Sequence, residues 1–273
     1  MKTFAWRRKR NLAITLLLAM IFLFWQASAA AALRKTSHWS GWLLLALVVF
    51  LAAYNWRKKF TSLPLGSSAA WLQCHIYVGL LSGVAFLGHI AWRFPNGSFE
   101  RILAGLFGLV FASGVCGLIV SRVFAHRLTT RGPEVLYERI SLFRKRLKNE
   151  VEELVLECLA ETESVAIPEF YANRLEAFFA RPRNLWQHVA QSDRPRRLLL
   201  LELEGCERYL NEAEKNALGK IVERVKAKDD LDYQFALQSV LKYWLFLHVP
   251  LTYSLLTFTA FHVLLVYAFW GGF

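Results

Sequence analysis

Five apolar stretches of this chain are each long enough to cross about 30 Å of hydrocarbon as a helix. They run from Leu12 to Leu33, Trp39 to Trp56, Trp71 to Trp92, Ile102 to Phe124 and Tyr243 to Trp270. Tryptophan lies at many of their ends, where an amphipathic ring settles at the headgroup level of a bilayer. Inside hydrocarbon only helices and closed barrels satisfy their own backbone groups. The sequence therefore predicts an all-α, polytopic membrane bundle of about five transmembrane helices.

The basic residues predict the orientation of these spans. The net charge is +12, but the segment between the fourth and fifth spans holds 20 of the 21 acidic residues and is close to neutral. The excess positive charge lies at span ends, in Arg7 to Arg10, Arg57 to Lys59 and a run that begins at Arg122. This pattern follows the rule that basic loops stay inside, and it does not predict a nucleic-acid-binding surface. We expect a multi-pass protein of the plasma (inner) membrane with its N-terminus in the cytoplasm.

The spans divide the chain into four predicted parts. Residues 1–38 hold an N-terminal transmembrane helix, 39–126 hold helices two to four, 127–240 form a cytoplasmic helical insertion, and 241–273 hold the fifth helix. A basic leader, an apolar run and a stretch of small residues ending near Ala30 also fit a cleavable signal peptide, and that alternative stays open. Either outcome leaves the later spans in the same orientation.

The polar segment has the periodicity of amphipathic helices rather than the motifs of an enzyme. Asn211, followed three residues later by Glu214, predicts one helix start, and Asp229-Asp230 predicts another. The helix of residues 231–241 should run directly into the fifth span. Because this segment has no Gly-rich phosphate loop, catalytic triad or cluster of metal ligands, we interpret it as a docking module for a redox partner protein or as a structural support.

Two histidine pairs repeat one spacing: His75 and His89 in the third span, and His248 and His262 in the fifth, lie 14 residues apart. Fourteen residues return to almost the same helix face and climb about 21 Å. The third and fifth spans run in the same direction. His75 and His248, the inner pair, should therefore lie near the cytoplasmic side, and His89 and His262, the outer pair, near the other side. Imidazole is a common metal ligand and is rare inside membranes, which favours two metal or heme sites.

Heme fits this pattern best, because its iron needs one imidazole from each side and its ring needs an apolar slot. Gly79 and Gly83 of the third span could make room for porphyrin, or could simply allow close helix packing. Zinc or copper transport is an alternative, but such sites usually recruit carboxylates, and Glu100 is the only acidic residue outside the polar segment. The four cysteines form no CxxC pair, which excludes c-type heme attachment.

The segments Cys74-His75 through Gly88-His89, and Leu247-His248 through Phe261-His262, resemble the diheme b-type membrane cytochromes. That group includes cytochrome b561-like proteins and the cytochrome b subunits of respiratory hydrogenases and formate dehydrogenases. The resemblance covers spans three to five and leaves the polar segment uncovered. It implies a four-helix core in membrane lipid with two heme b groups, one on the inner pair and one on the outer pair.

The same resemblance implies an electron-transfer subunit of an oxidoreductase complex rather than a stand-alone enzyme. Its electrons would pass between a quinone pool and a redox partner protein. Histidine pairs on the third and fifth spans are also similar to those of ferric reductases, but the flavin and nicotinamide modules of such enzymes are missing. An autonomous transmembrane reductase therefore stands as the first alternative. A heme-free membrane anchor or metal transporter stands as the second.

Overall fold

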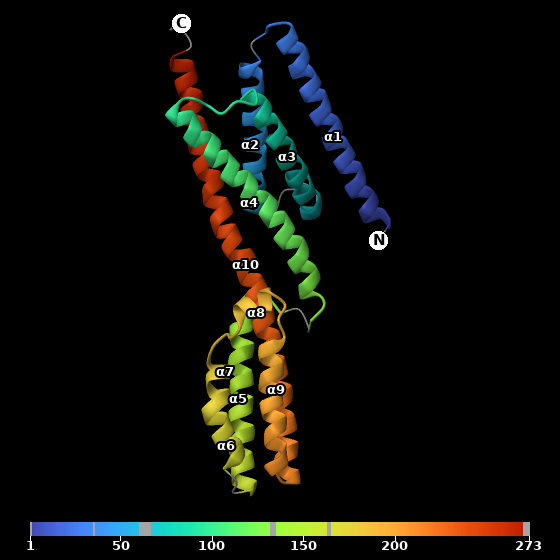
Figure 1. Ribbon diagram of the computed structural model, residues 1–273, viewed down its shortest axis with the longest axis vertical. Helices are drawn as coiled ribbons and strands as arrows, with labels where there is room; N and C mark the ends of the chain where they lie inside the picture. The colour runs from blue at the N-terminus through green and yellow to red at the C-terminus, as the bar shows by residue number, and fades with distance from the viewer. Residues whose placement is uncertain (1, 35, 60–66, 132–134, 163–164, 270–273) are drawn as a thin grey trace. The chain divides into compact units, whose positions relative to one another are not determined.

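The computed structural model describes residues 2–34, 36–59, 67–131, 135–162 and 165–269, and every regular element in these ranges is a helix (Figure 1). The predicted end of the fifth span at Trp270 and the side chains of Arg57 to Lys59 lie outside the described part. Five of the described helices are long and apolar enough to cross a membrane. They are α1 (Lys2–Ala31), α2 (Ser37–Lys59), α3 (Ser68–His89), α4 (Ser98–Leu128) and α10 (Glu212–Ala268). The expectation of an all-α chain with several membrane-length helices is thus confirmed.

The chain folds into two compact units. Unit 1 consists of Met1–Leu118 and Trp244–Phe273, and unit 2 of Ile119–Tyr243. Unit 2 contains α5 (Tyr137–Thr162), α6 (Ala166–Phe170), the π-helical turn η1 (Tyr171–Leu175), α7 (Glu176–Ala180), α8 (Leu185–Val189), α9 (Arg194–Cys206) and the short 3₁₀ turn η2 (Glu207–Tyr209). Helices α4 and α10 contribute residues to both units.

Side-chain contacts in unit 1 fix α1 parallel to α3. Near the start of both helices, Asn11 Nδ2 donates to Gln73 Oε1 at 3.2 Å. Near the end of both, the Gln26 side chain donates to the carbonyl oxygen of Gly88. A Cβ atom at Gly88 would lie 2.2 Å from Gln26 Oε1, so the missing side chain makes this approach possible. Small residues at helix crossings serve the same purpose in other membrane bundles.

Helix α4 runs antiparallel to both α3 and α10. Phe86 of α3 stacks on Phe107 of α4 with ring centroids 4.2 Å apart. Further along α4, Ser113 lies beside His248, while Phe99 at its beginning stacks on His262. Since α3 and α10 both oppose α4, they run in the same direction. Their histidines therefore follow each other in the same order along the bundle.

Unit 2 has its own apolar core. Its buried residues come from α5, from the α6 to α7 segment, from α9 and from α10, and include Val151, Phe179, Leu203, Ile221 and Val225. The predicted helix start at Asn211 is confirmed. Its backbone N–H donates to Glu214 Oε2 at 2.7 Å, and the N–H of Glu214 donates to Asn211 Oδ1 at 2.9 Å. This reciprocal capping box satisfies two amide groups that a helix end leaves unpaired.

The predicted helix start at Asp229-Asp230 is wrong, because α10 continues through both residues from Glu212 to Ala268. Their carboxylates bind side chains of other segments instead of capping a helix. Arg131 pairs with both aspartates, and Arg196 Nη1 lies 3.1 Å from Asp230 Oδ1. Because arginines of other segments neutralise both carboxylates, the helix continues through these two residues without interruption. The other predicted feature, direct continuation of this helix into the fifth span, is confirmed.

A fully buried ion pair joins α10 to the segment before α8. Lys228 pairs with Asp232 one turn later, and its Nζ also donates to the carbonyl of Arg181 at 3.1 Å. The carboxylate of Asp232 accepts from the backbone N–H of Arg183 at 3.0 Å. Burial lowers the pKa of Lys228 and raises the pKa of Asp232, and each partner opposes the shift of the other. The charged pair is therefore stable only while both members are present.

Replacing Gly88 by valine should loosen α1 from α3. The added atoms would overlap Gln26 and Phe22, and overpacking of this kind costs about 1–3 kcal/mol. We expect a lower thermal unfolding midpoint for the full chain in detergent, measured by circular dichroism. Gly105→Val is the matched control, since a Cβ there meets no described heavy atom within 4 Å. Equal midpoints for the two variants would contradict the close approach at Gly88.

Removing one member of the Lys228 and Asp232 pair should destabilise the chain more than removing both charges. Lys228→Met leaves a buried carboxylate without its counter-ion, and Asp232→Asn leaves a buried ammonium, each costing about 3–5 kcal/mol. In the double variant neither charge remains, so its loss should be smaller than either single loss. Urea unfolding of unit 2 in the full chain, followed by hydrogen exchange, measures this coupling. Strictly additive losses would show that the two groups do not interact.

Candidate functional site

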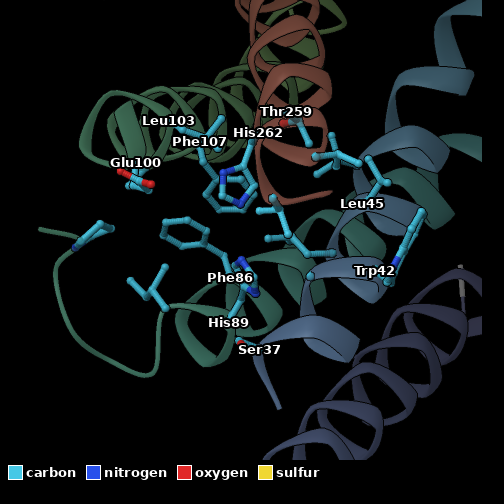
Figure 2. Close-up of a pocket in the computed structure, with 18 of the residues that line it drawn as sticks. Ser37, Trp42, Leu45, Phe86, His89, Glu100, Leu103, Phe107, Thr259 and His262 are labelled. Atoms are coloured by element: carbon cyan, nitrogen blue, oxygen red, sulfur yellow. The ribbon is translucent and has the colours of Figure 1, made fainter. Parts of the chain in front are cut away.

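A cavity of about 470 Å³ lies in unit 1 between α2, α3, α4 and α10. His89 of α3 and His262 of α10 both line it, so the structure brings the outer pair into one space. Figure 2 shows the two imidazoles entering this space from their separate helices, with Phe86 beside them. Its volume is in the range of pockets that hold cofactors and drug-sized ligands. The outer pair is therefore placed where both side chains can reach one bound group.

The walls of the cavity are mostly apolar, and a few polar groups lie among them. The apolar lining includes Val48, Phe86, Phe107 and Leu255, which also form the core cluster of unit 1. The polar lining includes His38, Arg93, Glu100, Thr259 and Tyr267. Such a space suits a large apolar ligand with a few charged or polar substituents.

The backbone reverses direction directly after His89. Helix α3 ends at this residue, and Ala91 and Trp92 adopt left-handed conformations with φ of 50° and 58°. Non-glycine residues seldom adopt this region, because Cβ approaches the backbone oxygen. The turn places Ile90, Ala91 and Arg93 in the cavity wall next to the imidazole. Backbone strain of this kind is often found beside functional sites.

His89 is held by two adjacent residues of α2. The hydroxyl of Ser40 lies 3.2 Å from His89 Nδ1, and Ser40 is fully buried. A Cβ atom at the next residue, Gly41, would lie only 3.0 Å from His89 Cε1. The glycine therefore allows the ring to rest against the backbone of α2.

His248 is held in the same way by α4. The hydroxyl of Ser113 lies 2.6 Å from His248 Nδ1, and a Cβ at Gly114 would lie 3.6 Å from His248 Cε1. Trp244, one turn earlier, stacks on the imidazole with centroids 5.4 Å apart and donates its indole N–H to the carbonyl of Ser113 at 2.8 Å. Gly117 makes room for this indole, since a Cβ there would overlap it at 1.9 Å.

The other two predicted ligands lie against aromatic rings. His75 of α3 has its ring centroid 5.0 Å from that of Tyr54 on α2. His262 of α10 stacks on Phe99 of α4 at 6.4 Å. The two members of the inner pair therefore contact different helices: His75 contacts α2, and His248 contacts α4. These contacts do not test whether His75 and His248 face one another, so their pairing stays a prediction.

The two predicted glycine positions differ in their surroundings. A Cβ at Gly79 would make ordinary contact with Leu51 at 3.9 Å, which leaves space near this residue. A Cβ at Gly83 would lie 2.6 Å from the ring of Phe111 on α4. The space beside Gly83 is therefore filled by an aromatic side chain, as expected for close helix packing. Gly79 remains compatible with either role.

Sequence reasoning missed Ser40, Gly41 and the role of Ser113 beside a histidine. The available signal was a Ser-Gly dipeptide on the span before that of His89, and another on the span before that of His248, each at the matching height of an antiparallel helix pair. Serine and glycine are common in membrane helices for packing alone, so the dipeptide by itself was not distinctive.

Comparison of the chain with protein-family models, with characterised proteins and with solved structures gives no match.

Proposed function

We propose that this chain is a diheme b-type membrane cytochrome that relays electrons across the bilayer. One observation carries the proposal: His89 and His262, on parallel helices, line one cavity of about 470 Å³ with apolar walls. The repeated spacing of 14 residues extends this arrangement to a second level at His75 and His248. Each level would hold one heme b between the two imidazoles.

The residues of the outer level fit a heme. Two imidazoles from opposite sides are one of the donor sets that six-coordinate heme iron takes from a protein. Phe86, Phe107 and Leu255 offer an apolar surface for the porphyrin faces. Arg93 lines the same cavity and could meet a propionate group, while Tyr267 could donate a hydrogen bond there.

The residues between the two levels support a relay. When bound, the hemes would supply one-electron redox chemistry. The two levels lie about 21 Å apart along the helices. Leu255 lies seven residues from both His248 and His262 on α10 and packs with Val48 and Phe107. This apolar cluster lies between the heights of the two levels on α10. With both axial positions taken by imidazole, oxygen chemistry at the iron is disfavoured.

The proposed partners follow from the charge pattern and the resemblance. We assign residues 127–240 to the cytoplasm of a plasma (inner) membrane protein, because the basic span ends lie on that side. Unit 2 has a core of its own and would dock a soluble redox partner. Quinone in the membrane would exchange electrons with the chain, as in cytochrome subunits of similar design.

The purified full chain should contain two b hemes. A pyridine hemochrome count on detergent-solubilised protein measures this directly. His89→Ala and His262→Ala should each lose the same heme, and His75→Ala and His248→Ala should each lose the other, because each iron needs both ligands. His38→Ala is the matched control, since His38 lines the outer cavity without belonging to a pair. A folded preparation without heme would reject the proposal and favour the anchor or transporter.

Carbon monoxide should leave the dithionite-reduced spectrum of the wild-type chain unchanged. Both axial positions are occupied in the proposed state, so the gas finds no open site. In His262→Ala, any heme retained on His89 should bind carbon monoxide and shift its Soret band. Rapid binding by the wild type would contradict ligation by two imidazoles and favour a site that reacts with small ligands.

A further inference from the structure

We propose that two Ser-Gly dipeptides, Ser40-Gly41 of α2 and Ser113-Gly114 of α4, hold His89 and His248 with Nδ1 protonated and the Nε2 lone pair directed to a ligand. These serines are positioning residues, because they act through the histidines. The identity of that ligand as heme iron rests on the proposed function. The tautomer itself does not.

The direction of the hydrogen bonds follows from the partners of each serine. The Ser113 hydroxyl donates to the carbonyl of Val110 at 2.9 Å, and the Ser40 hydroxyl donates to the carbonyl of Ser37 at 3.1 Å. A hydroxyl has a single proton, which these carbonyls take. Its oxygen then faces Nδ1 with a lone pair and can accept from the imidazole, which favours a proton on Nδ1 of the histidine.

The opposite arrangement is unfavourable. If the serine proton pointed to Nδ1, the hydroxyl and carbonyl oxygens would face each other at 2.9 Å without a proton between them in the case of Ser113. Two oxygen lone pairs in contact repel each other, and the carbonyl would lose the hydroxyl as a donor. In a low-dielectric interior such unmet groups are costly. A neutral imidazole with Nδ1–H therefore leaves Nε2 as its basic atom.

A glycine follows the serine at both contacts, and the approach is tight at Gly41 and an ordinary van der Waals contact at Gly114. At Gly41 and Gly114 a Cβ would lie 3.0 Å and 3.6 Å from the Cε1 atom of the held imidazole. This carbon lies between the two ring nitrogens, so the backbone supports the ring next to its hydrogen-bonded edge. The two sites thus use the same two residue types in the same order, on different helices and at opposite ends of the bundle.

A third Ser-Gly dipeptide shows that the motif alone is insufficient. Ser82 of α3 donates to the carbonyl of Gly79 at 2.8 Å, as the other two serines do to their own helices. Its neighbour Gly83, however, faces the ring of Phe111. The dipeptide contacts a histidine only where an antiparallel helix presents one at the same height, and Ser82 provides an internal control.

The pattern gives each proposed heme one serine-held ligand. At the outer level this is His89, and at the inner level His248, while their partners His262 and His75 lie against aromatic rings. A hydrogen bond from Nδ1–H makes Nε2 more basic and fixes the ring orientation. A more basic ligand stabilises ferric over ferrous iron. Losing the serine should therefore raise the midpoint potential of one heme and leave the other unchanged.

Nitrogen NMR of the full-length chain, labelled with ¹⁵N-histidine in lipid nanodiscs and prepared without heme, tests the tautomer directly. His89→Gln and His248→Gln identify the two signals. We expect Nδ1–H in both histidines of the wild type, and a mixture of tautomers for His248 in Ser113→Ala and for His89 in Ser40→Ala. Ser82→Ala should change neither signal. Predominant Nε2–H in the wild-type spectrum would overturn the proposal, whatever the variants do.

Redox titration of the heme-loaded chain gives the second readout. Ser113→Ala should raise one midpoint potential and weaken heme retention at that level about tenfold, as loss of such partners does at other metal sites. Ser113→Thr keeps the hydroxyl and should restore both values. If the chain binds no heme, the proposed function fails but the tautomer result stands. If heme binds and the potentials of Ser113→Ala and Ser40→Ala equal those of the wild type, the positioning role fails alone.

Discussion

Hydrocarbon offers no hydrogen-bond partner, so a polar side chain inside a membrane-length helix must find one on its own or a neighbouring helix. This constraint orders unit 1. Gln26 of α1 reaches the carbonyl of Gly88 on α3, and His248 of α10 meets the hydroxyl of Ser113 on α4. Each contact also sets the height of one helix against the next. A few polar contacts therefore determine the register that apolar surfaces alone would leave loose.

The same constraint acts on charges in the interior of unit 2. The buried Lys228 is neutralised by Asp232, and Asp229 by Arg131, so that α10 remains a continuous helix through four ionisable residues. The arginine comes from the segment that follows α4, about 100 residues earlier in the chain. Such pairs contribute little net stability against apolar residues of equal size, but losing one partner is costly. These ion pairs determine which segments pack together more than they increase the free energy of unfolding.

The elements were predictable where one local signal decided them. The apolar stretches gave the long helices, and Asn211 with Glu214 gave a helix start, because capping depends on residues only three positions apart. Asp229-Asp230 misled for the opposite reason. The carboxylates of these two aspartates bind arginines instead of a helix end. Those arginines are distant in sequence, so local residues do not reveal them.

The sequence by itself determined the membrane-length helices and the repeated spacing that places two histidines on one face of α3 and two on one face of α10. Periodicity and hydropathy are properties of a single segment, so they can be read without a fold. Only the tertiary structure decided which groups meet those histidines. It placed His89 and His262 around one cavity, put Ser40 beside one imidazole, and filled the space at Gly83 with Phe111. These contacts depend on the height and rotation of one helix against another, which no single helix encodes.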